Sequence, residues 1–482
     1  MRRERVRERV KASVTVLFAA LILGTTMVSQ ANNLQLANTV MEQTVIKFDI
    51  SWENSWRLDG VSEGDGYFHD AVWVFFKARA EGEEEWRHVK LAKAGVNPEG
   101  SNGGSIGNNI ELVVPEDCMG LFIRRSAEGS GSGTIDSSKV TVPWSYKASG
   151  FSMGQKLYLR SYAIEMVYVA EGPFWVGDGL TGFTRTLINT NDATTAAVKV
   201  DNEWQGGRPS GQTAPENAEW PNGYNAFYCM KYLITQGQYV DFLNSLTSVQ
   251  AVLRAYVGKA GRCTIGVSGG VYSADVPDRA CNYLSWVDTL AYAAWAGLRP
   301  LSELEYEKAC RGPLYPVPGE YAWGTDTIVT NLLLLNGVED GTEIVTNDVS
   351  IGAGITYGNS GGMNNLAKRV GIFARPGADR ISSGSSYWGI TDLSGHLCER
   401  SVSISDADGR KYLGSHGQGA LDPIEGIALN SDWYETGRTQ RGLGWHSSHS
   451  SITLLRVSYR NTEANAGGRV SSIGGRVARS AP

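Results

Sequence analysis

The sequence predicts an α+β protein in which a small all-β domain precedes a larger mixed domain. Three observations support this prediction. Between residues 44 and 144, about six short segments alternate apolar and polar residues, as half-buried strands do. Residues 285–312 contain two short helical patterns separated by a stop signal. The 482 residues include 58 glycines, 14 tryptophans and 21 tyrosines, which indicates many turns and a β-rich, aromatic-rich surface.

Residues 1–31 are predicted to form a signal peptide. A basic segment at 2–11 precedes an apolar segment at 12–28, and Ser29-Gln30-Ala31 provides a small-x-small cleavage site. The alternative is an uncleaved anchor of about 17 residues, slightly short for a membrane span. We expect cleavage after Ala31, no later transmembrane segment, and export to the periplasm, the cell surface or the extracellular space.

Residues 32–150, the N-terminal region, are predicted to form a β-sandwich. The clearest strand is Thr44–Trp52, whose side chains alternate between apolar and polar. The tryptophans of this region, with His69 or His88, could mark a glycan-binding face. The simpler alternative is that these side chains are core or scattered surface residues. We expect this region to act as a spacing, docking or anchoring module.

Residues 155–482, the C-terminal region, are organised around the two helices of 285–312. Ser285 caps the first helix with Asp288 three residues later, and Ser302 caps the second with Glu305. Gly297 provides the exit between them. A further helix is expected at 232–246, where Thr235 and Gln238 form a capping box. Two long irregular loops are also expected, at 178–225 and 327–369.

Six cysteines are too few for a disulfide framework. Cys263 and Cys281 flank one Gly-rich loop and could form a pair. The other four lie in apolar or motif positions, where buried thiols are equally plausible: Cys118, Cys229, Cys310 and Cys398.

The helical stretch reads W-x-D-x-x-x-Y-x-x-W-x-G-x-R-x-x-S-E-x-E-x-E-x-A-x-R-G from Trp286 to Gly312. Four more motifs follow in order: Tyr321-Ala-Trp-Gly-Thr-Asp326, Gly389-Ile-Thr-Asp-Leu-Ser-Gly395, Arg441-Gly-Leu-Gly-Trp445 and Ile473-Gly-Gly-Arg-Val-Ala-Arg479. Together they resemble the signature of the formylglycine-generating enzyme, or sulfatase-modifying factor, family. The resemblance implies a C-type-lectin-like fold for residues 155–482.

The family's activity requires two cysteines that follow the R-G-G-S-W turn. In the family they bind copper(I) and mediate the oxygen-dependent oxidation of a substrate cysteine, chemistry that needs soft thiolates. At the matching positions this chain has Ser447 and Ile452, and no cysteine follows Cys398. Since neither side chain can hold copper(I), we expect no copper and no formylglycine-generating activity.

Other chemistry has little support in the sequence. His446 and His449, with His416 nearby, could bind zinc or iron, but the alternative is solvent-facing histidines on a variable loop. No hydrolase, P-loop or dinucleotide motif occurs in its required context. A net charge of -6 argues against a nucleic acid partner.

The resemblance also implies a structural calcium ion in the turn that begins at Gly395. The expected ligands are the carbonyl oxygens of Gly395 and Leu397 and the carboxylate of Glu399. Asn331 stands at the spacing of the family's other calcium ligand. Three positions of the turn depart from the family's asparagine and tryptophans: His396, Cys398 and Arg400.

The segments 445–452 and 459–465, called here the C-terminal face, are expected to border the pocket that holds the family's active site. Candidate ligand contacts are Trp445, His446, Ser448, His449, Tyr459, Asn461 and Glu463. Such residues combine rigid aromatic area with adaptable hydrogen bonding. The fold and the placement of this segment also resemble the variable proteins of diversity-generating retroelements.

These observations predict an exported, non-catalytic protein that binds a protein or glycan ligand at the C-terminal face. Two alternatives stay open. The first is a self-associating structural subunit of an extracellular or cell-surface assembly. The second is a metal-dependent, oxidase-like enzyme of the same family with an altered active site.

Overall fold

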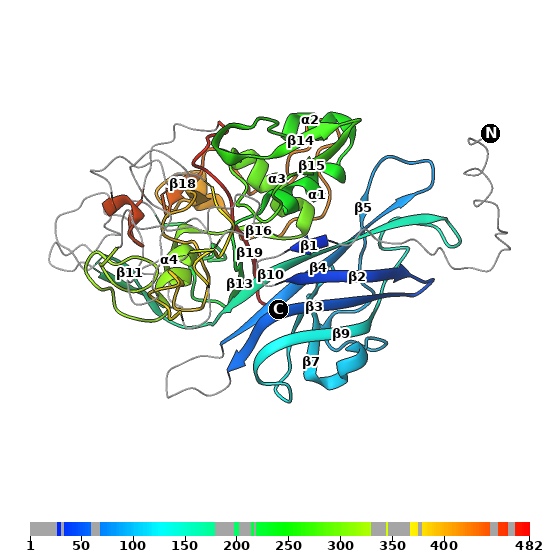
Figure 1. Ribbon diagram of the computed structural model, residues 1–482, viewed down its shortest axis with the longest axis horizontal. Coiled ribbons are helices and arrows are strands. Elements are labelled where there is room, and N and C mark those ends of the chain that lie inside the picture. Colours follow the sequence, from blue (N-terminus) through cyan, green and yellow to red (C-terminus); the bar gives the residue numbers. More distant parts are fainter. Residues whose placement is uncertain are drawn as a thin grey trace, which may run out of the picture.

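The computed structural model describes residues 27–29, 33–58, 68–178, 197–201, 214–215, 218–328, 344–345, 367–374, 378–443, 452–460 and 468–482. Its main element is a 13-stranded sheet (Figure 1). The strands along its main path, in spatial order, are β1 (Met27–Ser29), β2 (Leu34–Met41), β3 (Val45–Leu58), β4 (Phe68–Ala80), β10 (Leu157–Val169), β13 (Phe227–Met230), β19 (Val477–Ser480) and β16 (Arg299–Pro300).

Shorter elements surround this path. The remaining strands of the large sheet are β5 (Arg87–His88), β6 (Gly95–Val96), β7 (Ile110–Val114), β8 (Leu121–Arg125) and β9 (Gly131–Pro143). Three two-stranded sheets are formed by β11 (Phe174–Gly177) with β12 (Ala197–Val200), β14 (Ile265–Ser268) with β15 (Val271–Ala274), and β17 (Glu399–Val402) with β18 (Arg438–Arg441). The helices are α1 (Gln236–Asn244), α2 (Ser248–Arg254), α3 (Trp286–Ala296) and α4 (Glu303–Arg311), with the 3-10 turns η1 (Gly104–Asn109), η2 (Ala260–Arg262), η5 (Gly409–Lys411) and η6 (Ile452–Leu455).

The boundary that the sequence predicts near residue 150 falls inside this sheet. Strand β4 of the N-terminal region pairs antiparallel with β10 of the C-terminal region at every residue from 157 to 167. On its other side, β10 pairs with β13. The strands predicted for the N-terminal region are present, but their hydrogen bonding continues into the C-terminal region.

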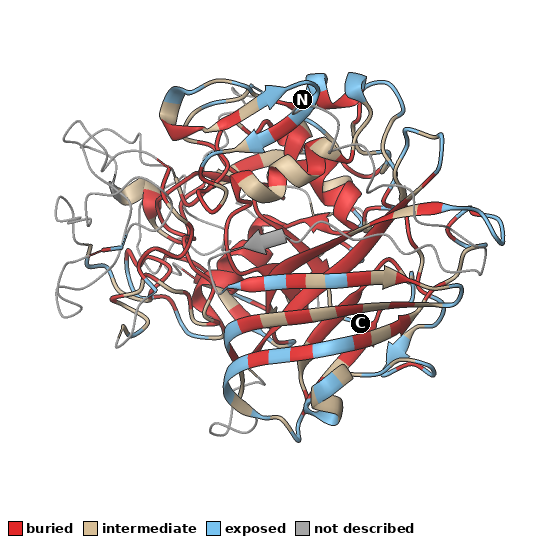
Figure 2. Ribbon diagram, turned by 45° about the vertical axis from the view of Figure 1, so that its right-hand side comes forward, coloured by how far each residue is buried: buried red, intermediate tan, exposed pale blue. Residues whose placement is uncertain are grey.

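The centre of the sheet is covered on both faces. Trp73 and Phe75 of β4 point into a core shared with α1 and α3. Val72, Val74 and Phe76 alternate with them and pack against β2, β3 and β9. Figure 2 shows the result: burial is continuous along the inner strands and alternates along the outer ones. Strands β4 and β10 therefore lie between two cores. One core is formed with α1 and α3, and the other is formed with β2, β3 and β9 of the same sheet.

The predicted helices are confirmed, with their capping boxes. The Ser285 hydroxyl accepts from the Asp288 amide, and Ser302 and Glu305 repeat the arrangement in α4. Gly297 ends α3 in the left-handed conformation, at φ 69°. The helix expected at 232–246 is shorter, because its capping box at Thr235 starts α1 at residue 236.

The glycan-binding interpretation of the N-terminal region is wrong for its histidines. His69 and His88 are 4% and 7% exposed, and Trp52 and Trp73 are fully buried. These side chains form part of the core. Cys263 and Cys281, expected as a potential pair, are both buried free thiols. In the part of the chain that the structure describes, every helix is too short or too polar to span a bilayer.

Candidate functional site

A buried cluster of charges lies beside the segments that flank the C-terminal face. Glu303 and Glu307 lie one turn apart on α4, and both are fully buried. Arg441 lies between them, with Nη2 3.4 Å from Glu303 Oε2 and 3.1 Å from Glu307 Oε1. Arg311 Nη1 is 3.4 Å from Glu307 Oε2, and Arg460 Nη2 is 2.7 Å from Glu303 Oε2. Five charged side chains thus form one buried network.

The network is stable only as a unit. Burial alone raises the pKa of Glu307, but Arg441, Arg311 and Arg460 together hold this pKa below its usual value. Burial lowers the pKa of Arg460 to about 10, which still leaves its guanidinium charged at neutral pH. Since each charge compensates another, removing one would leave its partner buried and unpaired.

Arg441 also joins the chain segments that precede and follow residues 444–451. Its Nη1 donates to the carbonyl oxygens of Val457 and Tyr459, at 2.9 and 3.2 Å. Ser458 Oγ lies 2.9 Å from Glu307 Oε2 and 2.6 Å from Gly177 O. The network therefore holds together the described residues on both sides of 444–451 and Arg460, which precedes 461–467.

Most of the predicted ligand contacts lie outside the described residues: Trp445, His446, Ser448, His449, Asn461 and Glu463. Ser447, at the position of one family cysteine, also lies outside them. Tyr459 is described and is buried, at 5% exposure. Ile452 begins η6. Only the Tyr459 position is therefore placed next to the charge network. The other contacts stay predictions.

The third histidine of the predicted metal cluster has an internal role. His416 is half-buried, and its Nε2 accepts a hydrogen bond from the Ser480 amide at 3.0 Å. Burial, with the nearby Arg479 and Arg299, lowers its pKa well below the usual value. Within the described ranges, no three side chains of His, Cys, Asp or Glu could hold one metal ion.

The predicted calcium turn contains several oxygen atoms without a hydrogen-bond donor. Glu399 Oε2 accepts from Arg476 Nε at 2.9 Å, whereas its buried Oε1 has no partner. Nor does any described residue donate to the carbonyl oxygens of Gly395 and Leu397. Burial raises the pKa of Glu399 although Arg476 opposes this. Carboxylate and carbonyl oxygens are the ligand types that a hard cation such as calcium prefers. Asn331 lies outside the described residues.

Asp392 is a second carboxylate at this turn, which the sequence reasoning did not assign. Its charge helps to raise the pKa of Glu399. Its Oδ1 lies 3.5 Å from His396 Nδ1, and His396 Nε2 accepts from the Lys368 amide at 2.9 Å, which places the imidazole proton on Nδ1. Asp392 and His396 both have positive φ values, 61° and 66°. The sequence did contain a signal for this carboxylate, because Asp392 lies within the family motif at 389–395.

All six cysteines of the chain are described, and none replaces the family's reactive pair. Five are buried, Cys118 is half-buried, and all are free thiols. Burial raises the pKa of Cys229 and of Cys398 to about 12, and it raises the pKa of the other four as well. Burial therefore disfavours the thiolate form of all six cysteines.

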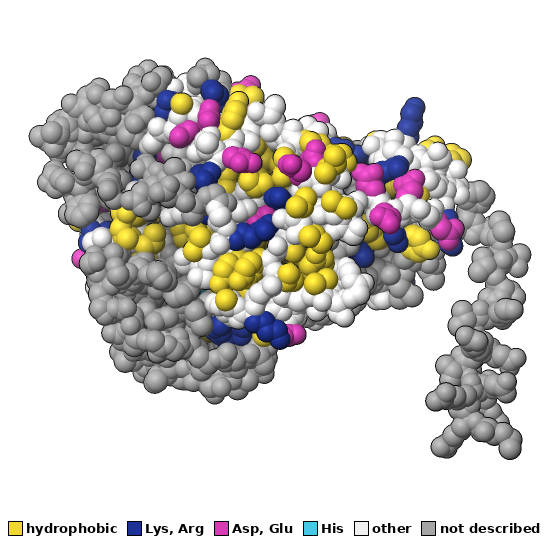
Figure 3. Space-filling model, turned by 90° about the horizontal axis from the view of Figure 1, so that it is seen from above, with side chains coloured by type: hydrophobic (Ala, Val, Ile, Leu, Met, Phe, Trp, Pro, Cys, Tyr) yellow, Lys and Arg dark blue, Asp and Glu magenta, His cyan; other side chains and the backbone are white. Residues whose placement is uncertain are grey.

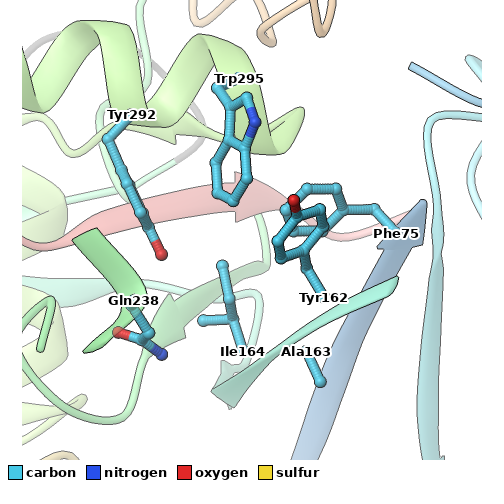
Figure 4. A pocket seen from close by; sticks show the side chains of 7 residues that line it. All are labelled: Phe75, Tyr162, Ala163, Ile164, Gln238, Tyr292 and Trp295. Atoms are coloured by element: carbon cyan, nitrogen blue, oxygen red, sulfur yellow. The ribbon is translucent and has the colours of Figure 1, made fainter. Parts of the chain in front are cut away.

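The described residues also contain a narrow gap between the two regions (Figure 4). It is lined by Phe75, Tyr162, Ala163, Ile164, Gln238, Tyr292 and Trp295. The gap leaves no room for a water molecule, and the Trp295 ring meets those of Phe75 and Tyr162 edge-on at 5.0 and 4.7 Å. It is therefore a packed junction and not a ligand site.

Comparison with known proteins agrees with the motifs. Residues 160–481 match the model of the sulfatase-modifying factor enzyme 1-like domain. No curated protein matches the chain. The many strands and few helices of the described residues are compatible with an α+β fold of the C-type-lectin-like kind. Because the match covers well over half of the sequence, the chain belongs to the formylglycine-generating enzyme, or sulfatase-modifying factor, family.

Proposed function

We propose that this chain is an exported, non-catalytic member of its family that binds a protein or glycan ligand at the C-terminal face. One observation carries the proposal. Ser447 and Ile452 occupy the positions of the family's two cysteines, and every cysteine of the chain lies elsewhere in the sequence. The two positions therefore lack the thiolate ligands that copper(I) needs in this family.

The charge network supports a binding role. Glu303, Glu307 and Arg441 are engaged with one another and with the backbone, so none is free to act on a substrate. What they supply is a rigid base for the segments that flank the C-terminal face. Fixing the residues next to a binding segment reduces the conformational entropy that is lost when the segment binds a partner.

An oxidation assay tests the non-catalytic part of the proposal. The purified chain is incubated with copper(I), oxygen, a thiol reductant and a sulfatase-derived peptide that carries the substrate cysteine. We expect no aldehyde in the peptide by mass spectrometry. The Ser447→Cys/Ile452→Cys variant is the matched control, since it restores both thiols and is expected to gain copper(I) binding. Aldehyde formation by the unaltered chain would show that the chain is catalytic and would refute the proposal.

Metal analysis separates this proposal from an oxidase-like enzyme that uses His446 and His449. Protein purified without chelators is compared with the His446→Ala/His449→Ala variant by elemental analysis. We expect no stoichiometric iron, copper or zinc in either protein. A transition metal near one equivalent that disappears in the variant would establish the enzyme alternative.

We also propose a structural calcium ion at the turn of Gly395, Leu397 and Glu399, with Asp392 beside it. The unpartnered Glu399 Oε1 supports this proposal. Calcium is expected to raise the melting temperature by several degrees, since it binds the folded state only. In Glu399→Gln the increment should disappear, whereas Glu425→Gln, an exposed control, should keep it. Equal melting temperatures of the unaltered chain in calcium and in chelator would refute the site.

A further inference from the structure

Two arginines at one end of the large sheet have no direct counter-charge. They are Arg79, on β4, and Arg160, on β10. In the part of the chain that the structure describes, no acidic side chain forms an ion pair with either, and nothing accepts a hydrogen bond from Arg79. The Nε atom of Arg79 is buried without a partner. Arg160 Nη1 donates to the Asn244 carbonyl oxygen, at 2.6 Å. A half-buried guanidinium that lacks an acceptor suggests a missing partner.

Aromatic rings hold both guanidinium groups in place. The Cζ atoms of Arg160 and Arg79 lie 4.2 and 5.1 Å from the centre of the Trp86 ring. Arg79 Cζ also lies 5.2 Å from the centre of the Tyr158 ring. All four side chains are half-buried, so water reaches them. Stacking on a ring fixes a planar guanidinium and leaves the N–H groups at its edge free to bind a ligand.

The sheet places the two arginines on the same face. Tyr158 is the cross-strand neighbour of Arg79, and Tyr162 is that of Phe75. Side chains alternate between the two faces of a sheet, so Arg79 and Arg160 lie on the face that packs against α1 and α3. Figure 1 shows β5, which pairs with this end of β4, on the opposite side of the molecule from β11. Both arginines therefore project from one face, at one end of the sheet.

The acidic side chains nearby in sequence do not neutralise these arginines. Glu81 is ion-paired with Lys156. Glu83 Oε2 lies 2.8 Å from Arg87 Nη2. The two glutamates at 84–85 are exposed and form no ion pair with either arginine. Figure 3 shows acidic and basic side chains next to one another toward the right-hand side, where β5 lies in Figure 1.

The carboxyl group of Asp241, on α1, does not neutralise Arg160 either. Burial raises the pKa of Asp241 to about 7, although the charge of Arg160 opposes this rise. The carboxyl group is therefore about half protonated at neutral pH. No described residue forms an ion pair with Asp241. Arg79 and Arg160 thus remain two positive charges against one indole ring.

We propose that Arg79 and Arg160 bind a doubly charged oxyanion of the phosphate or sulfate class beside Trp86. A guanidinium group has only N–H donors, and its planar fork matches the oxygen atoms of such an anion with paired hydrogen bonds. Two positive charges fit a dianion better than a single carboxylate, because each charge then has its counterpart. Charge pairs at half-exposed positions contribute little, so binding is weak, with a Kd of about 1 mM. The site is separate from the C-terminal face and does not depend on the ligand proposed there.

Isothermal titration calorimetry on the full chain, at constant ionic strength, tests the proposal. Phosphate and sulfate are each titrated to about 20 mM, and a saturable heat with a Kd near about 1 mM is expected for both. Acetate carries a single charge and should bind about tenfold more weakly. Glucose 6-phosphate separates two sources of the anion: tighter binding than phosphate indicates a phosphate ester, and equal or weaker binding indicates the free anion. The absence of a saturable heat with phosphate and with sulfate would overturn the proposal.

Variants of the two arginines test the site itself, with circular dichroism to check that each is folded. Arg79→Gln/Arg160→Gln should remove the saturable phosphate heat. Arg79→Lys keeps the charge but loses the planar fork, so it should weaken phosphate binding about threefold. Lys199→Gln/Lys259→Gln removes the same charge at two exposed positions and should bind phosphate like the unaltered chain. Phosphate binding that survives the loss of both arginines, that is unchanged in Arg79→Lys, or that is lost equally in the control would exclude the site.

Discussion

Replacing Trp73 by alanine is expected to lower the free energy of unfolding by about 4 kcal/mol. The indole comes from the N-terminal region, is fully buried, and donates from Nε1 to the Ala296 carbonyl oxygen at the end of α3, at 2.9 Å. Its ring lies 4.8 Å from that of Phe122 and 4.5 Å from the guanidinium of Arg479. Truncation removes all these contacts and leaves a large cavity between the regions.

Urea denaturation followed by circular dichroism measures this effect. Trp73→Phe keeps most of the packing but loses the hydrogen bond to Ala296, so a loss of about 1–2 kcal/mol is expected. Val96→Ala changes an exposed side chain and should have almost no effect. Because β4 and β10 share one sheet, a single cooperative transition is expected. Two separate transitions would contradict the packing described for this junction.

Replacing Glu307 by alanine is expected to cost about 4 kcal/mol, because it leaves buried arginines without compensation. Glu307 accepts from the Gly177 amide at 3.0 Å and from Arg441 Nη2 at 3.1 Å, and it is ion-paired with Arg311. Glu307→Gln keeps the shape but removes the charge, so it separates the electrostatic loss from the packing loss. Glu425→Ala, at an exposed position, is the control and should change stability by less than about 0.5 kcal/mol.

The pH dependence of stability gives a second measurement on the same variants. The arginines hold the pKa of Glu307 below its ordinary value of 4.5 in the folded state. Its contribution to stability is therefore present above pH 4.5 and is lost as pH falls through the folded-state pKa. Stability of Glu307→Gln should fall less steeply over this acid range than that of the unaltered chain. Identical slopes would show that the Glu307 carboxylate is not stabilised by the network.

Local signals predicted the helices well, and non-local ones were missed. The capping boxes at Ser285 and Ser302 depend on residues three apart, which the sequence displays directly. Strands β4 and β10 pair through residues about 90 positions apart in the sequence. The residues of one strand do not show which other strand it pairs with. The sequence therefore suggested two domains where the structure has one continuous sheet.

The candidate site shows the same division. The motifs contain Glu307 and Arg441, but nothing in their spacing reveals that the two side chains meet in the core. The opposite error occurred at His69 and His88, since a polar residue type suggested a surface role. His69 instead contributes its Nε2 to a buried contact with the Tyr228 hydroxyl at 3.0 Å. Whether a histidine lies in the core or at the surface depends on its burial and its tertiary contacts. Neither can be read from a short segment of sequence.

The order of strands in the large sheet has a consequence for how the chain folds. Strand β13 gains its second neighbour only from β19, roughly 250 residues later in the sequence. Closing so long a loop costs entropy before any contact repays it, so folding is expected to be slow. Until β19 has been synthesised, β13 keeps an open edge on which other chains could add. A chain of this topology is expected to aggregate less if it stays unfolded until its synthesis is complete. A chaperone that holds the chain unfolded is therefore expected to raise the yield of folded protein.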